Sequence, residues 1–249
     1  MIEWLTAFID MPPNSFDAGI AFWEAATGFS RSAARGDAGQ FTTLVAPTGD
    51  AFLRVQRVAV TEARVHLDIH VAEVPEGVRV ALELGARVLV PGGHVVMSSP
   101  GGLTFCVVPH RGGAQRPAPF EAAGEGPSLV DQLSIDVPCG AFPAEVAFWA
   151  ALSGYERRAA SRPEFEALVR PPAMPLRLLF QRLGDDDPGT HARAHLDLAG
   201  GANIDSIAAR HVELGAQVEH EESHWTTLRD PAGLPYCVTG RDPFTGLLG

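Results

Sequence analysis

The sequence has few cysteines and no long apolar segment, and both absences limit what the protein can be. Its three cysteines, Cys106, Cys139 and Cys237, form no CxxC pair, so a disulfide framework is not expected and a reducing cytoplasm is the predicted location. No apolar run approaches the roughly 18 residues of a membrane span, and the N-terminus lacks the basic start and apolar core of a signal peptide. A Gly-rich phosphate loop, a GxSxG motif and zinc-finger spacing are also missing.

Positive charge is scarce as well. The chain has 19 Lys and Arg against 30 Asp and Glu, which gives a formal net charge of -11. A surface of this sign repels phosphates, so neither nucleic acid nor an anionic membrane is expected as a partner. At 249 residues and 46% hydrophobic, the chain is long enough to bury a sizeable core and is expected to form two domains.

An internal repeat is the strongest pattern in the chain. The segment FIDMPPNSFDAGIAFWEAATGF (8–29) matches SIDVPCGAFPAEVAFWAALSGY (134–155), with Trp23 aligned to Trp149. Later landmarks, such as His66 with His195, show a slightly larger offset, which indicates small insertions in loops. The chain is therefore read as a duplication.

Residues 110–127, between the two copies, are rich in Gly, Pro and Ala and have no apolar period. Such a composition is typical of a linker without regular structure. We predict one domain over residues 1–112, a linker over 113–126 and a second domain over 127–249.

Each half splits again into two modules of similar layout. In the first, EWLTAFIDM predicts a strand and NSFDAGIAFWEAATG a helix, which Gly28 is placed to end. The second opens with the strand RVHLDIHV and continues with the helix EVPEGVRVALELGA, whose Leu82 is predicted to face inward together with Val74 and Val78. The second half repeats this layout, with Ile204, Ile207, Ala208 and Val212 as the apolar positions that mark its last helix. A strand, a helix and two or three further strands, four times over, predict an α+β fold with largely antiparallel sheets.

Histidine and aspartate recur side by side in two of these strands. His66, Asp68 and His70 occupy alternate positions, and His195 and Asp197 repeat the first two. Alternate strand residues point to one face of a sheet, so each half places His and Asp together. In one reading the aspartate has a structural role, in which it fixes the imidazole or meets an arginine of a neighbouring strand. In the other the pair contacts a substrate, because a histidine near its unperturbed pKa exchanges protons at neutral pH.

The phrases AFWEAATGF, HLDI, ALELGARVLV and SHWTTLRDPAGLPYCV, in this order of elements, resemble the vicinal oxygen chelate superfamily. Within it, the chain is most similar to the glyoxalase-like domains grouped with bleomycin-resistance proteins and extradiol dioxygenases. The resemblance implies tandem domains, each made of two paired βαβββ modules that form a half-barrel around a cavity. Two domains in one chain resemble a linked version of the dimers common in the family, so a monomer (a pseudo-dimer) or a homodimer is expected.

The resemblance also implies which side chains face each cavity. In the first half these are Thr6, Phe8, Arg54, Gln56, His66, Asp68, His70 and Cys106. In the second half they are Gln132, Ser134, Gln181, His195, Asp197 and Cys237, with Trp225 at the rim, where it can stack on a planar ligand.

Metal-dependent members of the superfamily bind their ion through His, Gln and Glu from four strands. The matching positions here are Thr6, Gln56, His66 and Cys106, and in the second half Gln132, Gln181, His195 and Cys237. Cysteine replaces the family's glutamate in both sets. One histidine with neutral amides is a poor site for a divalent ion, and a thiol must first lose its proton. A local site is also disfavoured, because His66 and Asp68 are separated by roughly 7 Å along the strand and converge only through bent side chains.

We therefore predict no complete metal site, with a divalent ion in the second domain as the alternative. The favoured function is that each cavity binds a small planar or hydrophobic molecule without changing it. The alternative is a lyase, isomerase or dioxygenase that uses a metal, or His195 and Asp197 as acid and base. The two cavities are expected to differ, since Ala199 stands where the first half has His70.

Overall fold

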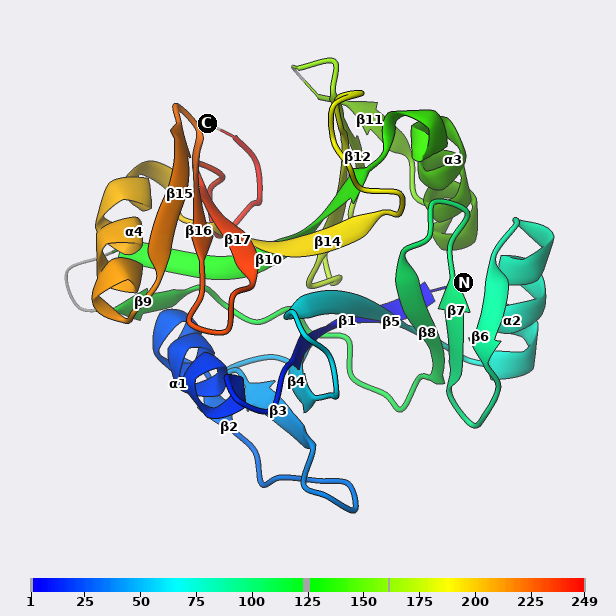
Figure 1. Ribbon diagram of the computed structural model, residues 1–249, viewed down its shortest axis with the longest axis horizontal. Coiled ribbons are helices and arrows are strands. Elements are labelled where there is room, and N and C mark those ends of the chain that lie inside the picture. The colour runs from blue at the N-terminus through cyan, green and yellow to red at the C-terminus, as the bar shows by residue number, and fades with distance from the viewer. Residues whose placement is uncertain (1, 123–125, 161, 249) are drawn as a thin grey trace. The chain divides into compact units, whose positions relative to one another are not determined.

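The computed structural model describes residues 2–122, 126–160 and 162–248. The first half has two helices and eight strands in one mixed sheet, in the order β2-β3-β4-β1-β5-β8-β7-β6 (Figure 1). Its elements are β1 (Ile2–Met11), α1 (Phe16–Thr27), β2 (Ser30–Arg31), β3 (Phe41–Val45), β4 (Leu53–Arg57), β5 (Arg64–Val71), α2 (Val74–Glu83), β6 (Arg87–Val90), β7 (Val95–Ser98) and β8 (Thr104–Pro109).

The second half repeats this plan with the sheet order β11-β12-β13-β10-β14-β17-β16-β15. Its elements are β10 (Gly126–Val137), α3 (Phe142–Ser153), β11 (Arg157–Ala159), β12 (Phe165–Leu168), β13 (Arg177–Arg182), β14 (Arg193–Ala199), α4 (Ile204–Glu213), β15 (Gln217–Glu222), β16 (Trp225–Arg229) and β17 (Pro235–Thr239), with short 3-10 turns before α3 and α4. The predicted α+β fold of tandem βαβββ modules is confirmed. None of the helices in the described ranges is long and apolar enough to cross a membrane.

Two parallel strand pairs determine where the polar residues meet. β5 pairs with β8 so that Asp68 lies opposite Cys106, and β14 pairs with β17 so that Asp197 lies opposite Cys237. The hairpin partners β7–β8 and β16–β17 are antiparallel. The same register in both halves follows from the duplication.

Contacts group the described residues into two compact units, and each unit draws on both halves of the sequence. One consists mainly of residues 66–115 and 133–194, the other mainly of residues 8–65 and 195–248. In the first unit, Trp149 of α3 is fully buried and packs edge-on against Phe105 of β8, with ring centroids 5.2 Å apart. The domain boundaries at 112 and 127 stay a prediction.

In each unit, a buried carboxylate accepts a hydrogen bond from a helix tryptophan: Trp149 of α3 in the first unit and Trp23 of α1 in the second. In the first, Glu145 accepts hydrogen bonds from Trp149 Nε1 (2.8 Å), from Ser99 Oγ (2.7 Å) and from the Gly101 amide (2.6 Å). In the second, Asp230 accepts one from Trp23 Nε1 at 2.8 Å. Burial raises the pKa of both carboxyl groups, while the hydrogen bonds compensate part of the cost of burying them.

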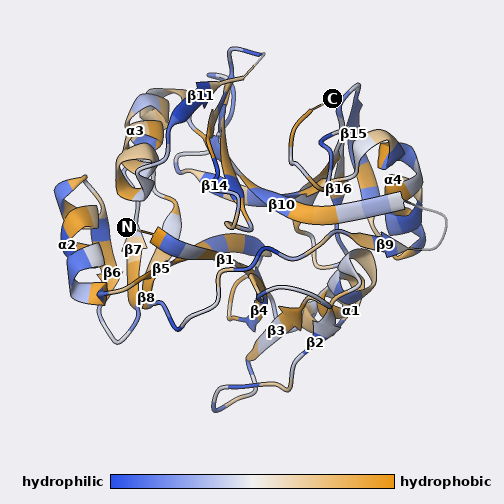
Figure 2. Ribbon diagram, turned by 180° about the vertical axis from the view of Figure 1, so that it is seen from behind, coloured by the Kyte–Doolittle hydropathy of each residue, from blue (hydrophilic) through white to orange (hydrophobic). Residues whose placement is uncertain are grey.

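The two amphipathic helices are α2 and α4, and α2 departs from one expectation. Hydrophilic and hydrophobic residues alternate along both (Figure 2), but Leu82 is 46% exposed, so its predicted inward orientation is wrong. In α4, Ile207 and Ala208 are buried, whereas Val212 is 44% exposed. The buried face of α2 is centred on Ala81 instead. Gly77 explains the rotation: a Cβ there would meet Val71 and Val107 side-chain carbons at 3.0 Å, so the helix approaches β5 and β8 through its glycine.

The predicted linker is not entirely without structure. Phe120–Ala122 form β9, which pairs antiparallel with the start of β10, Phe120 opposite Ser128. Backbone pairing of this kind needs no apolar period, which is why the composition did not reveal it.

Gly28 and Gly154, with φ of 67° and 72°, end α1 and α3 as left-handed caps.

Candidate functional site

The first group of polar side chains, hereafter the first cluster, is His66, Asp68 and Cys106. His66 and Asp68 project from the same face of β5, and the side chains bend toward each other until His66 Nε2 lies 3.5 Å from Asp68 Oδ1. Cys106 joins them from β8, and one ligand-type atom of each residue lies within 4.8 Å of the others. All three residues are buried.

The second cluster, His195, Asp197 and Cys237, repeats this arrangement in the second half. His195 Nε2 lies 3.3 Å from Asp197 Oδ1 and 3.7 Å from Cys237 Sγ. The Cys237 thiol also lies 3.5 Å from the hydroxyl of Thr227 on β16. The backbones of His and Asp are too far apart along the strand for a local site, which is why the sequence disfavoured one. In both halves the two side chains bend toward each other and close this gap.

The geometry of the second cluster differs from that of a nucleophilic triad. In a triad, one imidazole nitrogen faces the nucleophile and the other faces the carboxylate. Here the same nitrogen, His195 Nε2, faces both Asp197 and Cys237. The three atoms therefore converge on one point, which suits a bound cation or a polar group of a ligand, and not a proton relay to the thiol.

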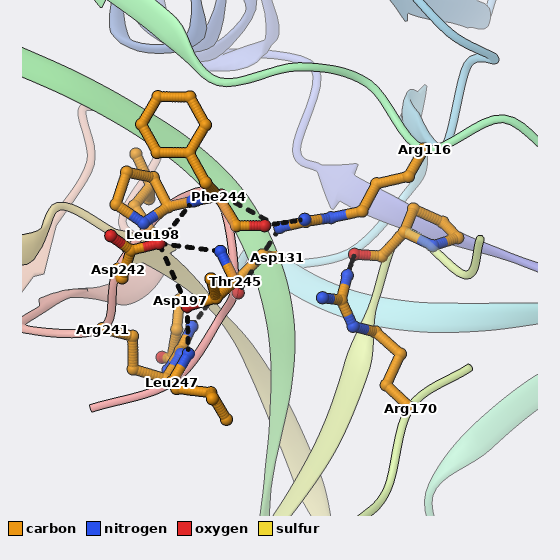
Figure 3. Close-up of polar contacts among 12 residues, drawn as sticks. Arg116, Asp131, Arg170, Asp197, Leu198, Arg241, Asp242, Phe244, Thr245 and Leu247 are labelled. Atoms are coloured by element: carbon orange, nitrogen blue, oxygen red, sulfur yellow. Dashed lines mark hydrogen bonds and ion pairs between the residues drawn. The ribbon is translucent and has the colours of Figure 1, made fainter. Parts of the chain in front are cut away.

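Buried charges surround Asp197. Gln132 Nε2 donates a hydrogen bond to Asp197 Oδ2, and Arg241 Nη1 lies 3.8 Å from the same oxygen. Arg241 Nη2 donates to Asp131 Oδ1, and Arg116 contacts the other oxygen of Asp131 at 3.9 Å. Figure 3 shows Arg241 close to both aspartates and Arg116 directed at the carbonyl of Phe244.

These contacts determine the protonation of Asp197. Burial pushes its pKa up, but the imidazole of His195, the guanidinium of Arg241 and the amide of Gln132 outweigh burial and hold the pKa below its ordinary value. Asp197 is therefore ionised at neutral pH. Its two oxygens differ, because Oδ2 accepts the bond from Gln132, whereas Oδ1 faces His195 Nε2 at 3.3 Å.

The first cluster has different neighbours. Thr6, at the position equivalent to Gln132, shares a hydrogen bond of 2.9 Å with His70 Nε2. His110 stands at the position of Arg241, and its ring centroid lies 6.2 Å from that of His70. Burial raises the pKa of the Cys106 thiol, which favours its neutral form. The positions that carry Arg241 and Asp131 in the second half are thus held by His110 and Leu5 in the first.

Unpartnered buried atoms mark both clusters. Asp68 Oδ1, Asp197 Oδ1, Gln132 Oε1 and Arg241 Nε make no hydrogen bond within the part of the chain that the structure describes. Native proteins rarely leave buried polar atoms without a hydrogen bond, and functional sites are one of the places where they occur. The clusters are therefore the best candidates for binding sites.

The remaining predicted site residues lie in the expected strands, but their place relative to the clusters stays a prediction. The Arg54 guanidinium lies over the Phe8 ring at 5.5 Å, Gln56 and Gln181 lie in β4 and β13, Ser134 is buried in β10, and Trp225 begins β16 opposite Thr239. Sequence reasoning missed Asp131, Arg241 and Arg116. Nothing local signals them, because the repeat aligns Asp131 with Leu5 and Arg241 with His110.

Comparisons with known proteins fit this architecture. The family model described as "Glyoxalase-like domain" matches residues 6–108 and again 132–239. No curated protein matches the chain. Among solved structures, the Mn(II)-bound glyoxalase from Novosphingobium aromaticivorans is 15% identical, with a TM-score of 0.65 over 100% of this chain and 86% of its own.

Two further solved structures are a dioxygenase and a synthase by their names. The 2,3-dioxygenase LapB from Pseudomonas sp. KL28 is 12% identical, with a TM-score of 0.66 over 96% of this chain and 92% of its own. A mutant of 4-hydroxymandelate synthase from Streptomyces coelicolor is 15% identical, with a TM-score of 0.59 over 100% and 94%. At these identities the likeness concerns the fold alone. The chain belongs to the glyoxalase-like family of the vicinal oxygen chelate superfamily and carries two tandem copies of its domain.

Proposed function

We propose that the protein binds small, planar or hydrophobic molecules at its two His–Asp–Cys clusters. The observation that carries this proposal is the pair of buried carboxylate oxygens, Asp68 Oδ1 and Asp197 Oδ1, whose nearest polar atoms are the imidazole nitrogens at 3.5 Å and 3.3 Å and which make no shorter hydrogen bond among the described residues. A ligand hydroxyl or N–H placed against either oxygen would satisfy it, at a net value of about 1.5–3 kcal/mol for a hydrogen bond to a charged group. The neighbouring imidazole offers a second polar contact in each cluster.

The two sites are proposed to take different ligands. In the first half, His70 follows Asp68 on the same face of β5 and its ring lies 6.2 Å from that of His110, and we propose that these imidazoles favour a ligand with an acidic group. The second lacks the imidazole of His70, since Ala199 replaces it, and we propose that it admits a larger or more apolar ring near Trp225. A cytoplasmic location and a monomeric or homodimeric state stay predictions.

A second candidate is an enzyme of the lyase, isomerase or dioxygenase type. It is favoured by the convergence of His195, Asp197 and Cys237 on one point. Nitrogen, oxygen and sulfur donors within 4.8 Å fit a divalent ion, which when bound would act as a Lewis acid on a substrate oxygen. Without an ion, His195 would move the proton, while ionised Asp197 would stabilise the charged imidazole.

Replacing each cluster histidine by alanine should weaken different ligands. His66→Ala and His195→Ala each remove one polar contact, so we expect a loss of roughly ten- to a hundredfold in affinity for the ligand of the altered site. The thermal midpoint should change little. The measurement is calorimetric titration of metal-free protein with a panel of phenols, catechols and aromatic carboxylates.

His220→Ala is the matched control, because His220 is exposed on β15 and should affect no ligand. If either cluster variant unfolds, and no ligand of the panel is weakened, the His–Asp pairs are structural and the proposal fails.

A further inference from the structure

We infer that the position of one buried carboxylate decides which helix packs on which hairpin loop, so that each half of the chain binds the other half and not a second copy of itself. The first loop, residues 99–103, joins β7 to β8, and the second loop, residues 230–234, joins β16 to β17. In the first unit α3 of the second half packs on the first loop, and in the second unit α1 of the first half packs on the second loop (Figure 1).

Each of these two contacts holds one buried carboxylate that accepts the indole N–H of the helix tryptophan. In the first unit the helix supplies it: Glu145 accepts from Trp149 Nε1 at 2.8 Å and from the Ser99 hydroxyl of the first loop at 2.7 Å. In the second unit the loop supplies it: Asp230 accepts from Trp23 Nε1 of α1 at 2.8 Å. The carboxylate thus comes from opposite sides of the contact in the two units.

The internal repeat shows that this exchange is reciprocal. Glu145 in α3 aligns with Gly19 in α1, and Asp230 in the second loop aligns with Ser99 in the first. The second half therefore supplies both carboxylates, and the first half supplies neither. Only a first half combined with a second half gives one carboxylate to each tryptophan.

Packing around the carboxylates follows the same division. A Cβ on Gly19 would lie 2.4 Å from Met11 Sδ and 3.0 Å from the Ala232 side chain, so other groups fill the place where a residue-19 side chain would begin. Gly101, which aligns with Ala232, donates its amide to Glu145 Oε2 at 2.6 Å, and a Cβ there would lie 2.8 Å from that oxygen. Because protein interiors are close-packed, each helix fits the loop that it has.

Pairing of a half with its own copy would be disfavoured for a different reason in each case. Two first halves would put Trp23 of α1 against the first loop, where Ser99 offers a hydroxyl in place of a carboxylate. Two second halves would put Glu145 against Asp230, both of which are buried acceptors. A buried N–H without a good acceptor and a buried carboxylate without a donor both cost stability. The partner that fits each loop is therefore the complementary half.

The test recreates both wrong contacts inside the full chain and measures thermal midpoints at neutral pH. Ser99→Asp gives the first unit two carboxylates and should lower the midpoint by about 10 °C. Ser99→Asn, the control of the same size without the charge, should lower it by about half as much.

Asp230→Ser recreates the wrong contact of the first half, because it takes the carboxylate from Trp23. The new hydroxyl can still accept the Leu234 amide, as the Ser99 hydroxyl accepts that of Leu103 at 2.9 Å. The turn is thereby kept, and the midpoint should fall by about 5 °C.

Moving the carboxylate from the helix to the loop should rescue the first unit. Glu145→Ala alone leaves Trp149 and the Gly101 amide without their acceptor and should lower the midpoint by about 10 °C. The double variant Ser99→Asp with Glu145→Ala has one carboxylate on the loop, as the second unit has. Its midpoint should lie within about 4 °C of the unaltered chain, whereas independent losses would add to roughly 20 °C.

Three results would overturn the carboxylate rule: equal losses for Ser99→Asp and Ser99→Asn, losses that add in the double variant, or an unchanged midpoint for Asp230→Ser. If Ser99→Asp does not fold, circular dichroism of the double variant decides, since a folded double variant supports the rule and an unfolded one contradicts it. These variants alter no residue of either His–Asp–Cys cluster, so their outcome leaves the proposed function to the ligand titrations.

Discussion

Replacing Arg241 by methionine should lower the free energy of unfolding by about 3–5 kcal/mol, the cost of breaking a buried ion pair from one side. Arg241 is 3% exposed and lies between Asp131, which accepts a hydrogen bond from it, and Asp197. Without the guanidinium both carboxylates remain buried, with Arg116 at 3.9 Å from Asp131 as a weak substitute. Urea denaturation at neutral pH measures the change.

The double variant Asp131→Leu with Arg241→Met should recover a large part of this loss, because it removes the stranded charge as well. Leucine is a reasonable replacement, since Leu5 occupies the equivalent position in the first half and is fully buried. Arg79→Met is the control: Arg79 pairs with Glu76 and Glu83 on the exposed face of α2, and its loss should leave the urea midpoint unchanged. An Arg241→Met variant as stable as Arg79→Met would show that the buried network contributes nothing.

Acid should destabilise the protein through His211. This residue is 2% exposed on α4, its Nδ1 lies 3.0 Å from the Tyr236 hydroxyl, and burial lowers its pKa to about 4 from its ordinary value of about 6.5. The unfolded chain therefore binds the proton more readily than the folded chain between these values. Stability from this group is complete above about pH 6.5 and falls as the pH drops toward 4.

The expected size of this loss between pH 7.5 and pH 5 is about 2 kcal/mol. Urea denaturation of the unaltered chain and of His211→Gln at both pH values measures it. At pH 7.5 the variant should be less stable than the unaltered chain, because it loses a packed ring. The difference between their free energies of unfolding should be about 2 kcal/mol smaller at pH 5 than at pH 7.5. Glu145 and Asp230, whose raised pKa values act in the opposite direction, are present in both proteins and cancel. Parallel pH curves would show that His211 titrates normally in the folded chain.

The duplication and its period-two strands made the fold predictable. The repeat located four βαβββ modules, and alternation in RVHLDIHV and RAHLDLA put His and Asp on one face of β5 and β14, as the structure has them. Helix faces were less predictable, because Gly77 turns α2 so that Ala81, and not Leu82, is buried. We retain the domain boundaries at 112 and 127 as a proposal.

The environment of the site was not predictable, because it depends on pairs that lie far apart in the sequence. Asp131 and Arg241 are 110 residues apart, and each aligns with an unrelated residue type in the first half. The repeat therefore gives no indication that these two residues form a pair. The contacts of the Asp197 carboxylate with both Gln132 and His195 could not be predicted from the sequence either.

The most direct test of the central proposal, ligand binding at the two clusters, is a long-range proton–nitrogen NMR spectrum of the histidine rings with and without ligand. His66, His195 and His211 are assigned from the single variants His66→Ala, His195→Ala and His211→Gln. A ligand from the panel that binds in calorimetry should shift the ring nitrogens of His66 or of His195, and should leave those of His211, buried against Tyr236, in place. A ligand that binds tightly and shifts neither His66 nor His195 would contradict the account.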